Sequence, residues 1–89
     1  MITLTQLRPS NRAKIVSLRL PHEVKERLCA LGVSRGRTIR LLSRSLLSRN
    51  YLVESETCRI GLRRKTAENI YVDEVDNVAN DGMDALDKR

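Results

Sequence analysis

Two glycines four residues apart, Gly32 and Gly36, separate an amphipathic segment from an alternating one near the middle of the chain. The amphipathic segment carries apolar residues at the i, i+4, i+7 spacing of one helix face, namely Val24, Leu28 and Leu31. The spacing predicts a helix over residues 21–31 that ends at Gly32 in a left-handed cap and leads, through Gly36, into a strand over residues 38–42. A helix that turns directly into a strand in this way is typical of the corner of a small barrel.

Other short segments of the chain alternate apolar residues with charged ones, as strands with one buried face do. The expected strands are residues 12–18, 38–42, 51–54, 58–62 and 70–72, with one helical turn at 66–69. Residues 4–9 form a lead-in that ends in a proline turn, and residues 43–50 form a long basic loop. We therefore expect a mainly β fold, a small SH3-like barrel of about five strands with one α-helix inserted after the first strand.

Length and charge predict one small domain with a tail. The 89 residues include no Phe or Trp and only two Tyr, so the core must be small and aliphatic. Residues 1–73 carry 15 Lys and Arg against 6 Asp and Glu, whereas residues 74–89 carry 2 against 5. We expect residues 1–73 to form the domain and residues 74–89 to be an acidic, disordered tail, because the tail has few bulky apolar residues.

The residue types that carry catalytic or metal chemistry are few. Cys29 and Cys58 are expected to be buried thiols without a disulfide, and together with His22 they lack metal-ligand spacing. Glu54 and Glu56 are expected to be solvated charges, and no glycine-rich phosphate loop occurs. The chain also lacks a leader-like segment and an apolar run long enough to cross a bilayer. We therefore expect a soluble, unprocessed, cytoplasmic protein that is not an enzyme and has no catalytic residue, no cofactor and no metal site.

A series of motifs gives the chain a resemblance to a known family. The motifs are Leu-x-x-Leu-x-Pro at 4–9, Ala-x-Ile at 13–15, Arg27-Leu28-x-x-Leu31-Gly32-Val33-x-x-Gly36-x-x-Ile39, and Leu62-Arg63-Arg64-x-x-Ala67-x-x-Ile70-x-Val72. In this order and spacing the chain resembles the FeoA family over residues 4–72. It departs from the family where Pro9-Ser10 replaces a frequent Pro-Gly, and where residues 45–50 lack Pro and Gly.

The resemblance implies an SH3-like accessory or regulatory protein of ferrous iron uptake. Such a protein would dock on the cytoplasmic part of a FeoB-like GTPase permease and would reach a membrane only through that partner. FeoA-like domains also occur at the C-terminus of metal-dependent transcriptional repressors, so a regulatory module related to those repressors is an alternative. Self-association as a homo-oligomer is compatible with either role.

The candidate partner-binding residues combine apolar side chains with arginines in the expected loop and after the fourth expected strand: Arg44, Leu46, Leu47, Arg49, Arg63 and Arg64. For Leu46 and Leu47, partial cover over one barrel end is an equally open interpretation. The arginines could also be merely solvated, or they could suit an acidic protein surface or the anionic cytoplasmic side of a membrane. They could also belong to a nonspecific nucleic-acid-binding barrel, since further basic residues are Arg35, Arg37, Arg40 and Lys65. The scarcity of aromatic side chains argues against sequence-specific nucleic-acid recognition.

Overall fold

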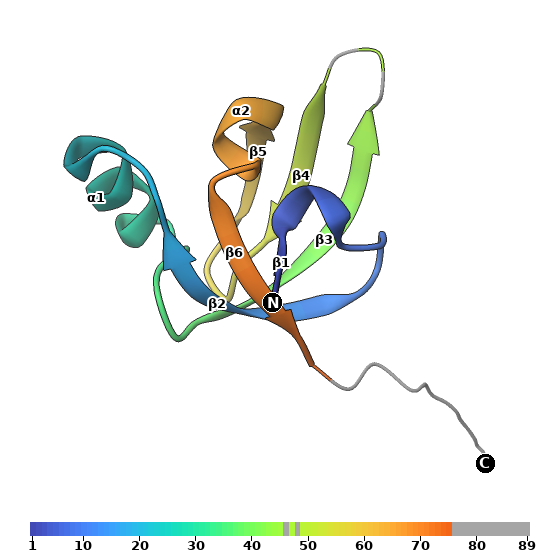
Figure 1. Ribbon diagram of the computed structural model, residues 1–89, viewed down its shortest axis with the longest axis horizontal. Helices are drawn as coiled ribbons and strands as arrows, with labels where there is room; N and C mark the ends of the chain where they lie inside the picture. Colours follow the sequence, from blue (N-terminus) through green and yellow to red (C-terminus); the bar gives the residue numbers. More distant parts are fainter. Residues whose placement is uncertain (46, 48, 76–89) are drawn as a thin grey trace.

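The computed structural model describes residues 1–45, 47 and 49–75, and within these residues six strands form one antiparallel sheet (Figure 1). The sheet order is β1-β6-β2-β3-β4-β5. The strands are β1 (Ile2–Thr3), β2 (Arg12–Leu18), β3 (Thr38–Ser45), β4 (Asn50–Glu54), β5 (Arg59–Arg63) and β6 (Ile70–Glu74). The helical elements are the 3₁₀ turn η1 (Leu4–Gln6), α1 (His22–Ala30) and α2 (Arg64–Ala67). The predicted mainly β fold with a helix after the first long strand is confirmed.

The sheet extends further than the apolar pattern predicts. The expectation of a loop over residues 43–50 is wrong, because β3 continues to Ser45 and pairs there with Asn50 of β4. A register shift after Leu41 leaves Leu42 as a bulge, and the ladder then continues through polar residues. A sixth strand arises because the two residues of β1 pair with β6. Backbone hydrogen bonds hold both the end of β3 and strand β1 in the sheet, and such bonds form without apolar side chains.

The core is one aliphatic cluster inside the curled sheet. Alternate residues of each strand point inward, as predicted for Ala13 and Ile15 in β2 and for Ile39 and Leu41 in β3. Tyr51 is the buried aromatic residue of the described part. The largest fully buried side chains are Leu4, Leu7, Ile15, Val33, Ile39, Leu41, Val53, Ile70 and Val72. Burial of such side chains stabilises the fold by roughly 1.5–3 kcal/mol each.

Helix α1 ends in a Schellman motif at Gly32, as the sequence predicts. The N–H of Gly32 donates to the carbonyl of Cys29 at 3.0 Å, and the N–H of Val33 donates to the carbonyl of Leu28 at 2.8 Å. Gly32 has a φ of +87°, which favours glycine. Leu28 and Val33 are both buried, so the apolar contact that accompanies this motif is present.

The predicted apolar stripe of α1 is only partly confirmed. Leu28 is buried and Val24 packs half-buried against the core, but Leu31 is 39% exposed. Leu31 is the C-cap residue, with φ −97° and ψ 7°, so the backbone leaves the helical path there and its side chain falls off the stripe. The helix therefore attaches to the sheet mainly through Leu28.

The chain enters β2 through a tight turn over residues 8–11. The N–H of Asn11 donates to the carbonyl of Arg8 at 3.1 Å, with Pro9 at the second position and Ser10, at a φ of +76°, at the third. This is the pattern of a type II turn, whose third position favours glycine. The N–H of Ser10 donates to the carbonyl of Leu41 at 2.6 Å and so holds the turn against β3.

Strand β6 ends the described part of the chain. It includes Glu74, which pairs with Ala13, and the N–H of Val75 donates to the carbonyl of Arg12 at 3.2 Å. The other residues of the predicted tail, 76–89, lie outside the described residues. No helix in the described ranges is both long enough and apolar enough to cross a bilayer.

Candidate functional site

Two segments far apart in the sequence meet where the β3–β4 hairpin approaches α2. The N–H of Arg64 donates to the carbonyl of Arg49 at 2.9 Å, and Arg63 pairs with the first residue of β4. A cleft of about 360 Å³ lies around this contact and is lined by Arg49, Arg63, Arg64, Lys65 and Glu68. The structure thus brings together three of the predicted partner-binding residues, Arg49, Arg63 and Arg64.

The charges of this cleft are only partly balanced. Arg64 donates to the carboxylate of Glu68 at 3.1 Å, one turn along α2. Arg49, Arg63 and Lys65 have no carboxylate within ion-pair distance among the described residues. Lys65 and Glu68 were not among the predicted partner-binding residues, although Lys65 directly follows the two arginines in the sequence.

Leu47 lies between β3 and β4, two residues before the cleft residue Arg49. Its side chain is 99% exposed, the highest value among the large apolar residues of the described part. The interpretation of Leu47 as cover over a barrel end is therefore wrong. Leu46 lies outside the described residues. We call Leu47, Arg49, Arg63, Arg64 and Lys65 together the basic hairpin end.

Arg44 lies apart from the cleft. It pairs with the buried Tyr51 in the β3–β4 ladder, so its side chain leaves β3 on the face that covers the core. Its Nη1 donates to the carbonyl of Thr5 in η1 at 3.4 Å. Arg44 therefore bridges β3 to η1, and the basic hairpin end does not include it.

The soft metal ligands of the chain do not converge. Cys29 is exposed on α1, which corrects the expectation of a buried thiol, because only the Val24–Leu28 side of this helix faces the sheet. Cys58 is half-buried, and both thiols are free. His22 is exposed, as predicted, and its Nε2 lies 3.2 Å from the carboxylate of Glu26. The described part holds no group of three His, Cys, Asp or Glu residues that could hold a metal ion.

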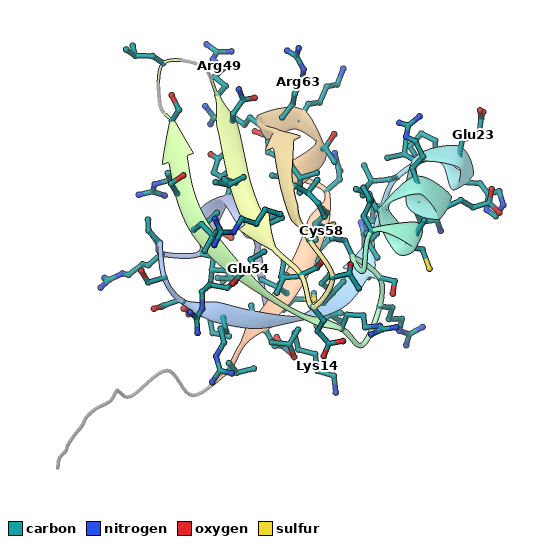
Figure 2. All side chains as sticks on the ribbon, turned by 180° about the vertical axis from the view of Figure 1, so that it is seen from behind. Lys14, Glu23, Arg49, Glu54, Cys58 and Arg63 are labelled. Carbon is teal, nitrogen blue, oxygen red and sulfur yellow. The ribbon has the colours of Figure 1, made fainter. Side chains whose placement is uncertain are left out.

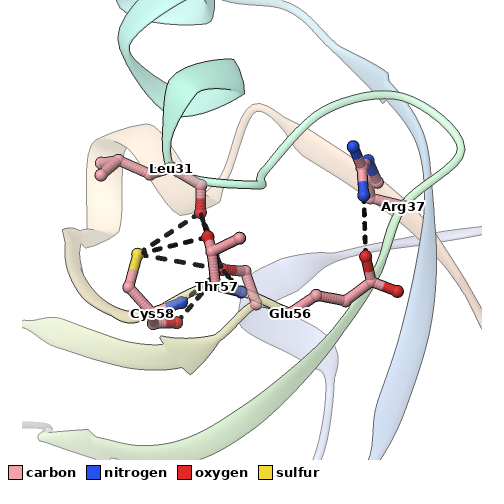
Figure 3. A network of polar contacts seen from close by, with 6 residues as sticks. Leu31, Arg37, Glu56, Thr57 and Cys58 are labelled. Carbon is pink, nitrogen blue, oxygen red and sulfur yellow. Dashed lines mark hydrogen bonds and ion pairs between the residues drawn. The ribbon is translucent and has the colours of Figure 1, made fainter.

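The side chains of the β4–β5 turn cap the end of α1 (Figure 3). The carbonyl of Leu31 accepts from the Ser55 hydroxyl at 2.7 Å, from the Thr57 hydroxyl at 3.0 Å and from the Cys58 thiol at 3.4 Å. Ser55 is the buried polar residue of the described part, and its oxygen also accepts from the N–H of Cys58 at 3.1 Å. Sequence reasoning missed this cap, because three small polar residues in a turn carry no periodic signal.

The two glutamates around this turn are surface charges, each with an arginine beside it. Glu56 accepts from Arg37 at 2.7 Å, and Glu54 accepts from Arg59 at 3.3 Å. Arg37, Glu56 and Arg59 are well exposed and Glu54 is partly exposed. Surface pairs of this kind contribute roughly 0–1 kcal/mol.

Comparison with known proteins gives the family. The sequence matches the FeoA domain over residues 2–74, a range that contains all six strands, the cleft and the cap of α1. The chain belongs to the FeoA family.

Known FeoA proteins share both sequence and shape with this FeoA-family chain. It is 31% identical over 71 residues to a chain of Campylobacter jejuni that is provisionally named Fe(2+) transport protein A, and the match covers 80% of this chain and 96% of that one. The solution structure of FeoA from Chlorobium tepidum superposes with a TM-score of 0.78 at 27% identity, covering 93% of this chain and 81% of that one. Zinc-complexed FeoA from Stenotrophomonas maltophilia, described as a procaryotic SH3 domain protein, gives 0.67 at 25% identity, covering 82% and 91%. The predicted SH3-like fold is confirmed.

Proposed function

We propose that this chain is a non-enzymatic, cytoplasmic accessory protein of ferrous iron uptake that docks on the cytoplasmic part of a FeoB-like GTPase permease and regulates it. Membership of the FeoA family and a relative named for Fe(2+) transport support the pathway. The docking surface in this proposal is the basic hairpin end, and Arg44, which lies apart from it beside η1, is a separate candidate contact.

The observation that supports this surface is a fully exposed leucine beside unbalanced positive charge. Leu47 is 99% exposed and lies two residues before Arg49, which lines the cleft together with Arg63 and Lys65. These three cations have no carboxylate partner in the described part. Protein interfaces concentrate arginines and large apolar side chains in this way. Uncompensated cations select a partner of opposite charge, so the matching surface of the permease is acidic and offers an apolar pocket.

The test is co-purification with the permease. The tagged chain is co-expressed with the FeoB-like permease of the same organism, the membranes are dissolved in a neutral detergent, and the retained permease is quantified. We expect Leu47→Asp and Arg63→Glu/Arg64→Glu each to lower the retained permease at least about tenfold, since each places negative charge on the proposed contact.

A matched control reverses two charges elsewhere. Lys14 on β2 and Arg35 before β3 are exposed and lie outside the basic cleft, so Lys14→Glu/Arg35→Glu makes the same change in net charge. This control should retain the permease at the wild-type level. If the wild-type chain does not retain the permease, the proposal that it docks on the permease is wrong. If all variants retain the permease equally, the proposed docking surface is wrong.

Nonspecific binding to nucleic acid predicts a different result for the same cations. A short DNA duplex would then bind the wild-type chain with an affinity that falls steeply with salt, on the order of one power of the salt concentration for each phosphate contacted. Our proposal predicts that the permease is retained in the presence of excess duplex. Loss of the permease to competing duplex would favour the nucleic-acid function instead.

A further inference from the structure

We propose that the basic hairpin end also binds the anionic surface of a lipid bilayer directly, with Leu47 among the headgroups and Arg49, Arg63 and Lys65 on their phosphates. This goes beyond docking on a permease, because it needs no protein partner. The family resemblance implies that the protein reaches a membrane only through the permease, whereas this proposal adds a direct contact with lipid.

The first argument is the position of Leu47. Strands β3 and β4 reach further toward this end of the molecule than β5 and β6 do (Figure 1), and Leu47 follows the last residue of β3 by two positions. The leucine there is 99% exposed, whereas Leu31 and Leu52 are 39% and 37% exposed on the body of the domain. An apolar side chain held wholly in water gains free energy wherever it is covered. One leucine alone binds a membrane weakly, so a second attraction is needed.

The second attraction comes from the cations at the same end of the domain as Leu47. Arg49 and Arg63 project from the same end of the molecule, and Lys14 lies at the opposite end (Figure 2). The N–H of Arg64 donates to the carbonyl of Arg49 at 2.9 Å and so joins the hairpin to α2. This hydrogen bond fixes the position of Arg49 relative to Arg63, the neighbour of Arg64. Glu68 neutralises Arg64 but leaves Arg49, Arg63 and Lys65 free to meet phosphates. Each such cation at an anionic membrane surface strengthens binding about fivefold.

The shape of this end favours a bilayer over other anionic surfaces. A fully exposed leucine two residues before Arg49, at the end of the domain that also carries Arg63, fits a plane of headgroups that is soft and apolar underneath. Nucleic acid would leave Leu47 in water, and single strands are bound with stacked aromatic side chains, which the basic hairpin end does not contain.

The experiment is sedimentation of the full chain with vesicles, without any permease. Vesicles of phosphatidylcholine alone are compared with vesicles of about three parts phosphatidylcholine to one part phosphatidylglycerol. We expect binding to the anionic vesicles only, and its loss in about 0.5 M NaCl because salt screens the cations. Arg49→Gln/Arg63→Gln/Lys65→Gln should weaken binding on the order of 100-fold.

The matched control removes three charges outside the basic cleft. Lys14→Gln/Lys25→Gln/Arg35→Gln changes the net charge by the same amount and should lose much less affinity than the triple variant of the basic hairpin end. Equal losses in the two triple variants would show that net charge alone drives binding, and would overturn the proposed surface. Competition by millimolar inorganic phosphate at constant ionic strength would reveal a small-anion site, and would overturn the bilayer.

A fluorescence measurement tests the leucine separately. The chain has no Trp, so Leu47→Trp carries the sole indole and changes a side chain that touches nothing in the core. Its emission should shift to the blue with anionic vesicles, whereas a Lys14→Trp control at the opposite end should not shift. Absence of a shift at position 47 would overturn insertion. Vesicle binding that fails while permease capture persists would sink this inference and leave the proposed function standing.

Discussion

Gly32 lies directly against Ser55: a Cβ atom added to Gly32 would stand 2.9 Å from the Ser55 hydroxyl oxygen and 3.0 Å from that of Thr57. Gly36 has nearly the same φ, +88° against +87°, but open space where its Cβ would be. We expect Gly36→Ala to cost about 1–2 kcal/mol, the cost of left-handed backbone for a residue with a Cβ. Gly32→Ala should cost about 1–3 kcal/mol more, because the buried Ser55 hydroxyl must move. Urea unfolding of both variants measures the difference, and equal costs would contradict the close approach.

Ser55 should matter more than Thr57 to the cap on α1. Ser55→Ala removes the shortest donor to the Leu31 carbonyl and leaves the N–H of Cys58 without its acceptor, at a cost of about 1–3 kcal/mol. Thr57→Val leaves the Ser55 bond in place at an exposed position and should cost less than about 1 kcal/mol. Unfolding gives the free energies, and amide exchange at Gly32 and Val33 should accelerate in Ser55→Ala alone. Equal effects of the two changes would contradict this ranking.

Ser10→Gly should stabilise the protein. The turn holds Ser10 at a φ of +76°, where a Cβ costs about 1–2 kcal/mol, and glycine loses part of that gain to the greater freedom of the unfolded chain. We expect a net gain of about 0.5–1 kcal/mol in the free energy of unfolding. Ser43→Gly, in the paired part of β3, is the control and should destabilise by about 0.5–1 kcal/mol. A loss of stability on Ser10→Gly would show that the side chain has a role beyond the turn.

Removal of the acidic residue from the cleft should strengthen vesicle binding. Glu68→Gln frees Arg64 from its carboxylate, so one more cation can meet a phosphate and affinity for anionic vesicles should rise about fivefold. Stability should change by less than about 0.5 kcal/mol, because an exposed i,i+4 pair contributes little. Glu26→Gln, which breaks the comparable pair on α1, should leave vesicle affinity nearly unchanged. Equal gains from the two changes would point to net charge.

The strands that line the core were predictable from the sequence, because burial of one face makes apolar and polar residues alternate. Strand β2 has the predicted bounds, since its inward and outward residues alternate without interruption as far as Ile15. The end of β3 was missed because Ser43, Arg44 and Ser45 pair through the backbone, beyond a bulge that resets the alternation. Leu31 was misplaced because the periodic stripe takes no account of where the helical backbone ends.

Three residues of the candidate site were predicted from the sequence, but not that Arg49 meets Arg63 and Arg64 in space. Arg63 and Arg64 are adjacent, and the pairing of β4 with β5 brings Arg49 to them. Arg44 lies apart from the cleft because the bulge at Leu42 changes the face on which it projects, toward Thr5. The cap on Leu31 joins positions that are 24 to 27 residues apart, and local pattern cannot encode such a contact.

The two-residue strand β1 covers the outer edge of β6, where Ile2 lies opposite Val72. If those two residues were displaced, the edge of β6 at Tyr71 and Val72 would face solvent in an extended form. Such an edge is a template on which other chains can assemble. Pairing of Ile2 and Thr3 with β6 therefore leaves this part of the sheet edge unavailable to other chains.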